Sequence, residues 1–141
     1  MNKAYVLERF VQAQQPVYAQ VLEELQAGRK QSHWMWFIFP QIKGLGHSEM
    51  ARRYAISSKD EAAAYLAHPV LGPRLEQCAQ LVLAIQGKSL DEIFGHPDNM
   101  KFCSSMTLFA SVAGPASIFQ ACLNKYCGNQ ADPGTLGKLA E

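Results

Sequence analysis

The chain has 141 residues, of which 48% are hydrophobic and 18% are charged, and its formal net charge is +1. This length fits one domain, residues 1–141, and the hydrophobic fraction is enough to bury a core, which excludes an intrinsically disordered chain. No apolar run reaches the roughly 18 residues of a membrane-spanning helix, so we expect no membrane partner. The first residues lack the uninterrupted apolar stretch of a secretory signal, which favours a cytoplasmic location.

Basic residues are concentrated in one part of the chain. Residues 29–59 hold six Lys or Arg and one Glu, whereas the remainder is acidic on balance. Such a block is either an ordinary solvated face or a surface that attracts anions. A net charge close to zero does not favour nucleic acid as a partner, although the basic block leaves that alternative open. The sequence names no protein partner.

The four cysteines do not predict a metal or cofactor site. Cys78, Cys103, Cys122 and Cys127 form no CxxC motif, and no histidine stands at zinc-like spacing from a pair of them. The first three occupy apolar positions of helical patterns. We therefore interpret the cysteines as reduced residues of a cytoplasmic core, and we expect neither a metal nor a cofactor.

The elements predicted in chain order are helices, because apolar spacings of three and four recur and strict alternation is hard to find. The first spans residues 3–14, and the second begins near Pro16 and ends at Gly28. Ser58 and Ser89 each open a capping box. After the aromatic run at 32–41, helices are predicted over 48–55, 58–66, 71–85 and 97–113, then up to about 127. Short turns are predicted at 89–95 and after Asp132. The prediction is an all-α, single-domain multihelical bundle of about 6–8 short helices, with orthogonal rather than coiled-coil packing.

The aromatic run SHWMWFIFPQ, residues 32–41, is apolar on both faces of any regular structure. We therefore expect its centre to be a buried helix of about two turns, capped by Ser32 and ended by Pro40. Burying each large ring is worth roughly 2–3 kcal/mol, so the run should anchor the fold. Trp34 or Trp36 could also offer a stacking wall to a ligand.

Polar and glycine residues follow the aromatic run. Gly44 and Gly46 would let backbone amides approach a ligand after Gln41, and Ser48 can cap the next helix with Arg52 one turn on. This is the composition of an anion pocket, and a plain turn is the alternative. The glycines match neither a Walker A motif nor a dinucleotide fingerprint.

A second polar cluster lies near the start of the helix predicted at 97–113. Lys101, Ser104 and Ser105 are spaced i, i+3, i+4 and so share one face. An ammonium and two hydroxyls suit a phosphate or carboxylate, whereas the alternative is a solvated lysine beside serines in tight helix contacts. Asp98 and Asp132 are the loop acids most able to face a cleft.

Three segments make the chain similar to a widespread bacterial family of unknown function: SHWMWFIFPQIKGLGHSEMARRYAI, EAAAYLAHPVLGPRL and IFGHPDNMKFCSSMTLF. Its members are often labelled "calpastatin". The resemblance covers nearly the whole chain and implies a small, mainly α-helical cytosolic protein with no established activity. The label fits poorly, because calpastatin-type inhibitors are polar and disordered whereas this chain carries a dense aromatic core. The polar or glycine positions that the family shares are Ser32, His33, Gln41, Gly44, Gly46, Ser48, Tyr54, Lys101, Ser104, Ser105 and Thr107.

The leading hypothesis is a helical domain that binds a small anionic or nucleotide-like ligand. If it is an enzyme, metal-independent hydrolysis or glycosyl transfer is expected, with His33 as general acid or base and Lys101 as the charge stabiliser. The candidate ligand-binding residues are Trp34, Trp36, Gln41, Gly44, Gly46, Ser48, Arg52, Ser104 and Ser105. Two alternatives stay open: a non-catalytic adaptor whose basic face binds protein or RNA, and a purely structural domain.

Overall fold

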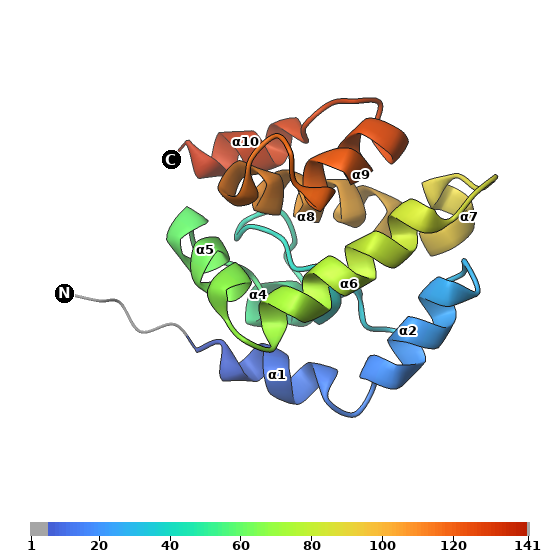
Figure 1. Ribbon diagram of the computed structural model, residues 1–141. Coiled ribbons are helices and arrows are strands. Elements are labelled where there is room, and N and C mark those ends of the chain that lie inside the picture. The colour runs from blue at the N-terminus through green and yellow to red at the C-terminus, as the bar shows by residue number, and fades with distance from the viewer. Residues whose placement is uncertain (1–5, 141) are drawn as a thin grey trace.

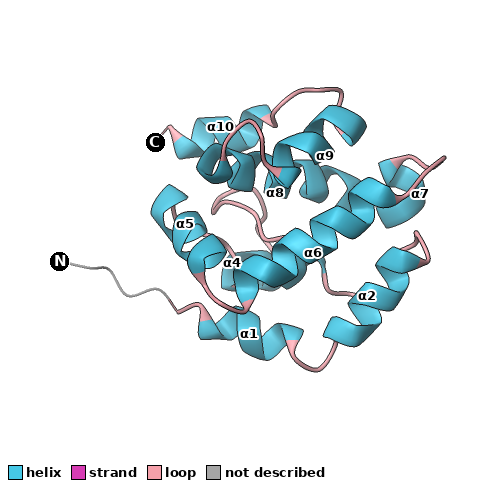
Figure 2. Cartoon of the chain, viewed as in Figure 1, coloured by secondary structure: helices cyan, strands magenta, loops and turns pink. Residues whose placement is uncertain are grey.

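A computed structural model describes residues 6–140, and these residues form ten helices and no strand (Figure 2). The helices are α1 Glu8–Gln14, α2 Tyr18–Gln26, α3 Met35–Ile38, α4 Glu49–Arg53, α5 Lys59–Ala67, α6 Leu71–Ala84, α7 Leu90–Phe94, α8 Asp98–Ala113, α9 Ile118–Tyr126 and α10 Pro133–Leu139. The all-α prediction is confirmed. The predicted number of six to eight is too low, because the short turns expected at 89–95 and after Asp132 are the helices α7 and α10.

Helix α8 is the central helix of the bundle. It packs against α5, α7, α9 and α10, while α6 contacts α2, α5 and α9. Figure 1 shows α6 running obliquely across the front of the molecule, with α8, α9 and α10 above it and α1 and α2 below. Within residues 6–140, none of the helices has the length and apolar character needed to cross a lipid bilayer.

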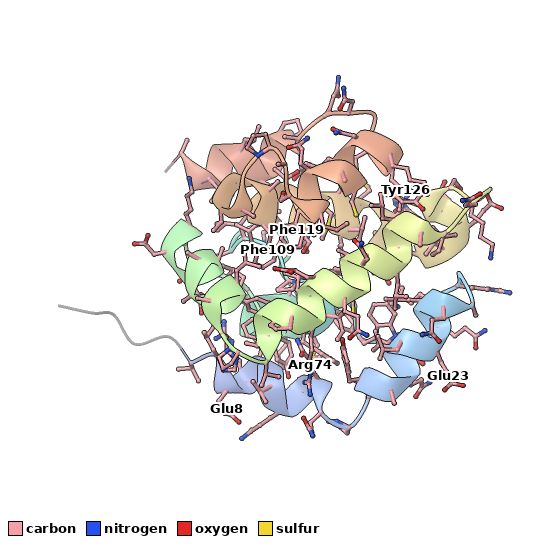
Figure 3. All side chains as sticks on the ribbon, in the orientation of Figure 1. Glu8, Glu23, Arg74, Phe109, Phe119 and Tyr126 are labelled. Carbon is pink, nitrogen blue, oxygen red and sulfur yellow. A yellow bond between two sulfur atoms is a disulfide. The ribbon has the colours of Figure 1, made fainter. Side chains whose placement is uncertain are left out.

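The interior is built largely from aromatic rings. Phe39 meets the ring of Phe102 edge-on, with centroids 5.0 Å apart, and meets Phe94 edge-on at 6.0 Å. Figure 3 shows Phe109 and Phe119 in the middle of the molecule, and their centroids lie 5.8 Å apart between α8 and α9. Edge-on and tilted rings avoid repulsion between their electron-rich faces, so these contacts add to the stability that burial provides.

The aromatic run is buried as predicted, but its helix is shorter and is capped differently. Helix α3 covers a single turn, and its N-cap position is Trp34 rather than Ser32. The Ser32 hydroxyl instead donates a hydrogen bond to the Glu24 carboxylate. Pro40 follows the helix as expected and is buried. The cap prediction is wrong because α3 begins at Met35, so Ser32 lies two positions before the N-cap.

Other helix ends agree with the sequence to different degrees. Ser89 forms a complete capping box with Glu92 at the start of α7. Ser58 accepts a hydrogen bond from the Glu61 amide, but the Glu61 carboxylate accepts from the Ser57 amide instead of completing a box. Helix α1 begins at Glu8, whereas the prediction began at residue 3, and residues 3–5 lie outside the described part of the chain.

The prediction that the cysteines are reduced is wrong for two of them. Cys103 of α8 forms a disulfide with Cys127, which follows α9, and their Cα atoms are 6.0 Å apart. The two cysteines are 24 positions apart, and only the packing of α9 against α8 brings them together. Cys78 and Cys122 are buried free thiols, and burial raises the pKa of each to about 12.

Candidate functional site

The segment after the aromatic run leaves the core and returns to it at a parallel bridge. Ile42 pairs with Ile56 in this bridge, and both side chains are buried. The Ile56 amide donates to the Gln41 carbonyl and the Lys43 amide donates to the Ile56 carbonyl, each at 2.8 Å. The intervening residues 43–55, which include α4, therefore project from two fixed ends.

The two glycines of this segment are needed for different reasons. Gly44 has φ +101°, a backbone conformation that side-chain-bearing residues rarely adopt. A Cβ on Gly46 would lie 2.6 Å from the Cβ of Ala51, so the absence of a side chain there lets the segment fold back on α4.

A pocket of about 420 Å³ opens where this segment meets the starts of α8 and α10. We call it the α8–α10 pocket. Its volume is within the usual range for small-molecule sites. Its polar lining residues are Gln41, His47, Ser48, Lys101, Ser104 and Asp132. Three segments far apart in the sequence therefore contribute donors and acceptors to one cavity.

Lys101 is the cation on the pocket wall. Its ammonium lies 3.5 Å from the Asp98 carboxylate and 5.1 Å from the ring centre of Trp36. Asp98 also pairs with Lys30 at 2.9 Å, so one carboxylate is shared by two lysines. The charge of Lys101 is therefore only partly compensated, and 25% of its side-chain surface is exposed to solvent.

Asp132 brings a carboxylate to the same pocket while capping α10. Its Oδ2 accepts hydrogen bonds from the Thr135 amide at 3.0 Å, the Thr135 hydroxyl at 2.6 Å and the Ser104 hydroxyl at 3.0 Å. Its own amide donates to the Thr107 hydroxyl at 2.8 Å. These bonds fix the carboxylate against α8, and they explain why Ser104 and Thr107 are buried despite their polarity.

Five of the predicted site residues line the α8–α10 pocket: Gln41, Gly46, Ser48, Lys101 and Ser104. Ser48 also caps α4, as predicted, by accepting from the Ala51 amide at 3.1 Å. Gly44 and Arg52 line a neighbouring hollow of about 120 Å³ that shares Gln41 and Gly46 with the pocket.

The remaining predicted residues lie elsewhere. His33 is exposed next to the aromatic run and is not among the residues that line the pocket. Trp34 is 1% exposed, and its indole N–H donates to Glu24, so it is a core residue and not a stacking wall. Trp36 lies beneath Lys101 without lining the pocket.

Ser105, the last of the predicted residues, is fully buried, and its hydroxyl has no hydrogen-bond partner within the described residues.

Two polar residues that line the pocket, His47 and Asp132, are not among the residues predicted for the site. His47 sits in the glycine-rich stretch, yet only its neighbours were assigned to the site. Asp132 was recognised as an acid able to face a cleft but was not joined to Lys101. Its position before Pro133 and Gly134, at a helix start, was the available signal.

A second hollow, of about 340 Å³, adjoins the α8–α10 pocket. The two share Met100 and Asp132, and Tyr126 and Cys103 are on the wall of the second one. Met100 is 60% exposed between them. No group of three or more His, Cys, Asp or Glu residues within residues 6–140 is arranged to hold a metal ion.

Comparison with known proteins agrees with this fold. The crystal structure of the conserved hypothetical protein Rv1873 from Mycobacterium tuberculosis matches with a TM-score of 0.92 and 58% sequence identity, over 96% of each chain. A family model described as "Protein of unknown function (DUF1810)" matches residues 4–139. No curated protein matches the chain.

Proposed function

The chain belongs to the DUF1810 family of proteins of unknown function, and from this premise we propose that it binds a small anionic molecule in the α8–α10 pocket. The observation that carries the proposal is the convergence of polar side chains on one cavity. Gln41 and Ser48 come from the projecting segment, and Lys101 and Ser104 come from α8, some sixty positions later. A few convergent polar groups around a hollow of this size are the arrangement found in small-molecule sites.

Lys101 gives the pocket its preference for negative charge. Its partner Asp98 is already shared with Lys30. An incoming carboxylate or phosphate would therefore add a second anionic partner to an ammonium that has one such partner among residues 6–140. The Trp36 ring under the ammonium restricts the directions in which the lysine can point. An anion would also accept hydrogen bonds from the Ser48 hydroxyl and the Gln41 side-chain amide, which are neutral donors.

The ligand we propose is smaller than a nucleotide. A stacked base needs an aromatic face in the pocket, and neither Trp34 nor Trp36 lines it. The calpastatin label is not part of the proposal either, since the buried aromatic interior is unlike a disordered inhibitor.

One observation favours an enzymatic form of this proposal, metal-independent hydrolysis. The titratable groups His47 and Asp132 line the same cavity, so an acid and a base would both be within reach of a bound molecule. His33, exposed outside the pocket, is replaced in this scheme by His47. Product formation, followed by NMR of any ligand found to bind, would separate an enzyme from a binding protein.

The test is binding of a defined set of anions, measured by isothermal titration calorimetry and thermal shift. The set comprises inorganic phosphate, sulfate, short carboxylates, sugar phosphates and mononucleotides. We expect at least one non-nucleotide anion to bind, and Lys101→Met to weaken that binding by about tenfold or more, since a charge-assisted hydrogen bond is worth about 1.5–3 kcal/mol.

Two controls make the result specific to the pocket. Lys101→Arg keeps the charge and should retain most of the binding, whereas Lys59→Met removes an exposed lysine at the start of α5 and should change nothing. Equal binding by Lys101→Met and the unmodified protein would contradict the proposal, and so would the failure of every compound to bind. A protein that then co-purifies with the chain would favour the adaptor alternative.

A further inference from the structure

We infer that Asp132 makes the α8–α10 pocket selective for anions that also carry a hydrogen-bond donor, an ammonium or a hydroxyl, at the far end of the molecule from the anionic group. The inference rests on the proposed function and names the ligand class that the pocket would accept.

The pocket presents two opposite charges that do not neutralise each other. Lys101 and Asp132 both line it, yet the ion-pair partner of Lys101 is Asp98. Among residues 6–140, no ion pair within 4.0 Å joins Lys101 to Asp132. A ligand with only negative charge would gain the attraction of Lys101 but would also meet the repulsion of Asp132. A ligand with an anionic end and a donor end can satisfy both residues.

The two charged groups lie apart along α8. The Lys101 ammonium lies 3.5 Å from the carboxylate of Asp98, three residues before it, whereas Asp132 accepts a hydrogen bond from Ser104, three residues after it. Asp98 and Ser104 are about 9 Å apart along the helix axis. A molecule that satisfies both Lys101 and Asp132 therefore carries its donor several bonds away from its anionic group.

Asp132 also has acceptor capacity to spare. All three hydrogen bonds that its carboxylate accepts from the described residues go to Oδ2. The donors are the amide and the hydroxyl of Thr135 and the hydroxyl of Ser104. No hydrogen bond from the described residues reaches Oδ1. An ionised carboxylate offers about four lone-pair sites, so a donor on the ligand would find an acceptor already held in place by the α10 cap.

The variant that tests this inference is Asp132→Asn. Asparagine caps helices about as well as aspartate, so its carbonyl oxygen can keep the contacts with Thr135 and Ser104. Its amide nitrogen would then take the place of Oδ1, which turns the acceptor into a donor and removes the negative charge. Asp60→Asn, at an exposed position of α5, is the matched control.

The ligands are matched pairs that differ in the donor alone. The pair 4-hydroxybutyrate and butyrate tests a hydroxyl, 4-aminobutyrate and butyrate test an ammonium, and 3-hydroxypropyl phosphate and propyl phosphate test a hydroxyl on a phosphate ester. We expect the protein to prefer the donor-bearing member of at least one pair by about tenfold or more. We expect Asp132→Asn to reduce that ratio to about one or to invert it, while Asp60→Asn leaves it unchanged.

The outcomes separate this inference from the proposal on which it rests. Equal affinity for both members of every pair would overturn the selectivity while leaving an anion pocket in place, and this result needs no variant. A preference that survives in Asp132→Asn would remove Asp132 as its cause. If none of the ligands binds at all, the inference and the proposed function both fail.

Discussion

The indole N–H of Trp34 donates a hydrogen bond of 3.0 Å to Oε1 of Glu24, inside the molecule. The same carboxylate accepts hydrogen bonds from the backbone amides of Gln31 and Ser32 and from the Ser32 hydroxyl. A single buried acid on α2 therefore fixes the path of the chain just before the aromatic run. This arrangement explains why Trp34 serves the core and is not available to a ligand.

Removing this carboxylate should destabilise the protein strongly. Glu24→Ala leaves the buried indole N–H of Trp34 and three part-buried donors without their acceptor, and we expect a loss of about 3 kcal/mol in the free energy of unfolding. Glu23→Ala is the control, because Glu23 is the preceding residue of α2 and points outward at the edge of the molecule (Figure 3). Urea unfolding of both variants gives the comparison. Similar losses for the two would show that Glu24 is not an organising residue.

The stability supplied by Glu24 should depend on pH in the acid range. Burial alone would raise its pKa, but the hydrogen bonds from Ser32, Gln31 and Trp34 outweigh that effect and lower the pKa from 4.5 to about 2. Because the folded-state pKa is below the unfolded value, the contribution is present above about pH 4.5 and is lost as the pH falls towards 2.

The measurement is the difference in unfolding free energy between the unmodified protein and Glu24→Gln, which cannot ionise at this position. We expect a constant difference from pH 7 down to about 5 and a progressive decrease below that. A difference that stays the same at pH 2.5 as at pH 7 would contradict the lowered pKa.

Most helices could be predicted because their signals are local. The Ser48 and Ser89 caps depend only on amides two or three residues away, and each predicted cap is present. The start and end of α8 follow from Pro97 and Gly114, and both agree with the prediction. Ser32 is not a cap because α3 begins only at Met35, and a run that is apolar on both faces carries no local signal for where its helix begins.

The site could be predicted only in outline. The polar residues around Gln41 and those around Lys101 were recognised separately, and the α8–α10 pocket has both groups on its wall. Which way each residue faces was not predictable: Ser104 and Ser105 are neighbours on α8, yet only the first lines the pocket. The pairing of Cys103 with Cys127 was missed for the same reason, because it depends on how α9 packs on α8.

The disulfide should contribute measurably to stability. Cross-linking residues 24 positions apart reduces the entropy of the unfolded chain by an amount worth about 3 kcal/mol. Thermal unfolding with a phosphine reductant should therefore begin at a lower temperature than without it, and Cys103→Ser with Cys127→Ser should unfold at the lower temperature in both conditions. Thiol titration of the denatured, unreduced protein should find two thiols, Cys78 and Cys122, whereas four would show that the bond is absent.

The neighbouring serines of α8 should respond oppositely to the same substitution. Ser105→Ala removes a buried hydroxyl without a partner in the described residues, so we expect stability to stay equal or to rise by up to about 1 kcal/mol. Ser104→Ala removes the hydrogen bond to Asp132 and should cost about 1 kcal/mol. Urea unfolding of the two variants side by side tests the contrast. A larger loss for Ser105→Ala would reveal a hydrogen bond that this hydroxyl makes in solution.

The bridge between Ile42 and Ile56 has a consequence for how such proteins could diversify. Both ends of the segment at 43–55 are held by the interior, through the Ile42–Ile56 bridge and through the buried ring of Tyr54, which packs on Phe10 and Phe37. The residues at 47–49, between these anchors, are exposed. Exchanges or insertions at 47–49 would reshape one side of the cavity while the helical scaffold kept its packing. New ligand preferences could thus arise by remodelling a single tethered segment, without the loss of stability that usually accompanies change in a core.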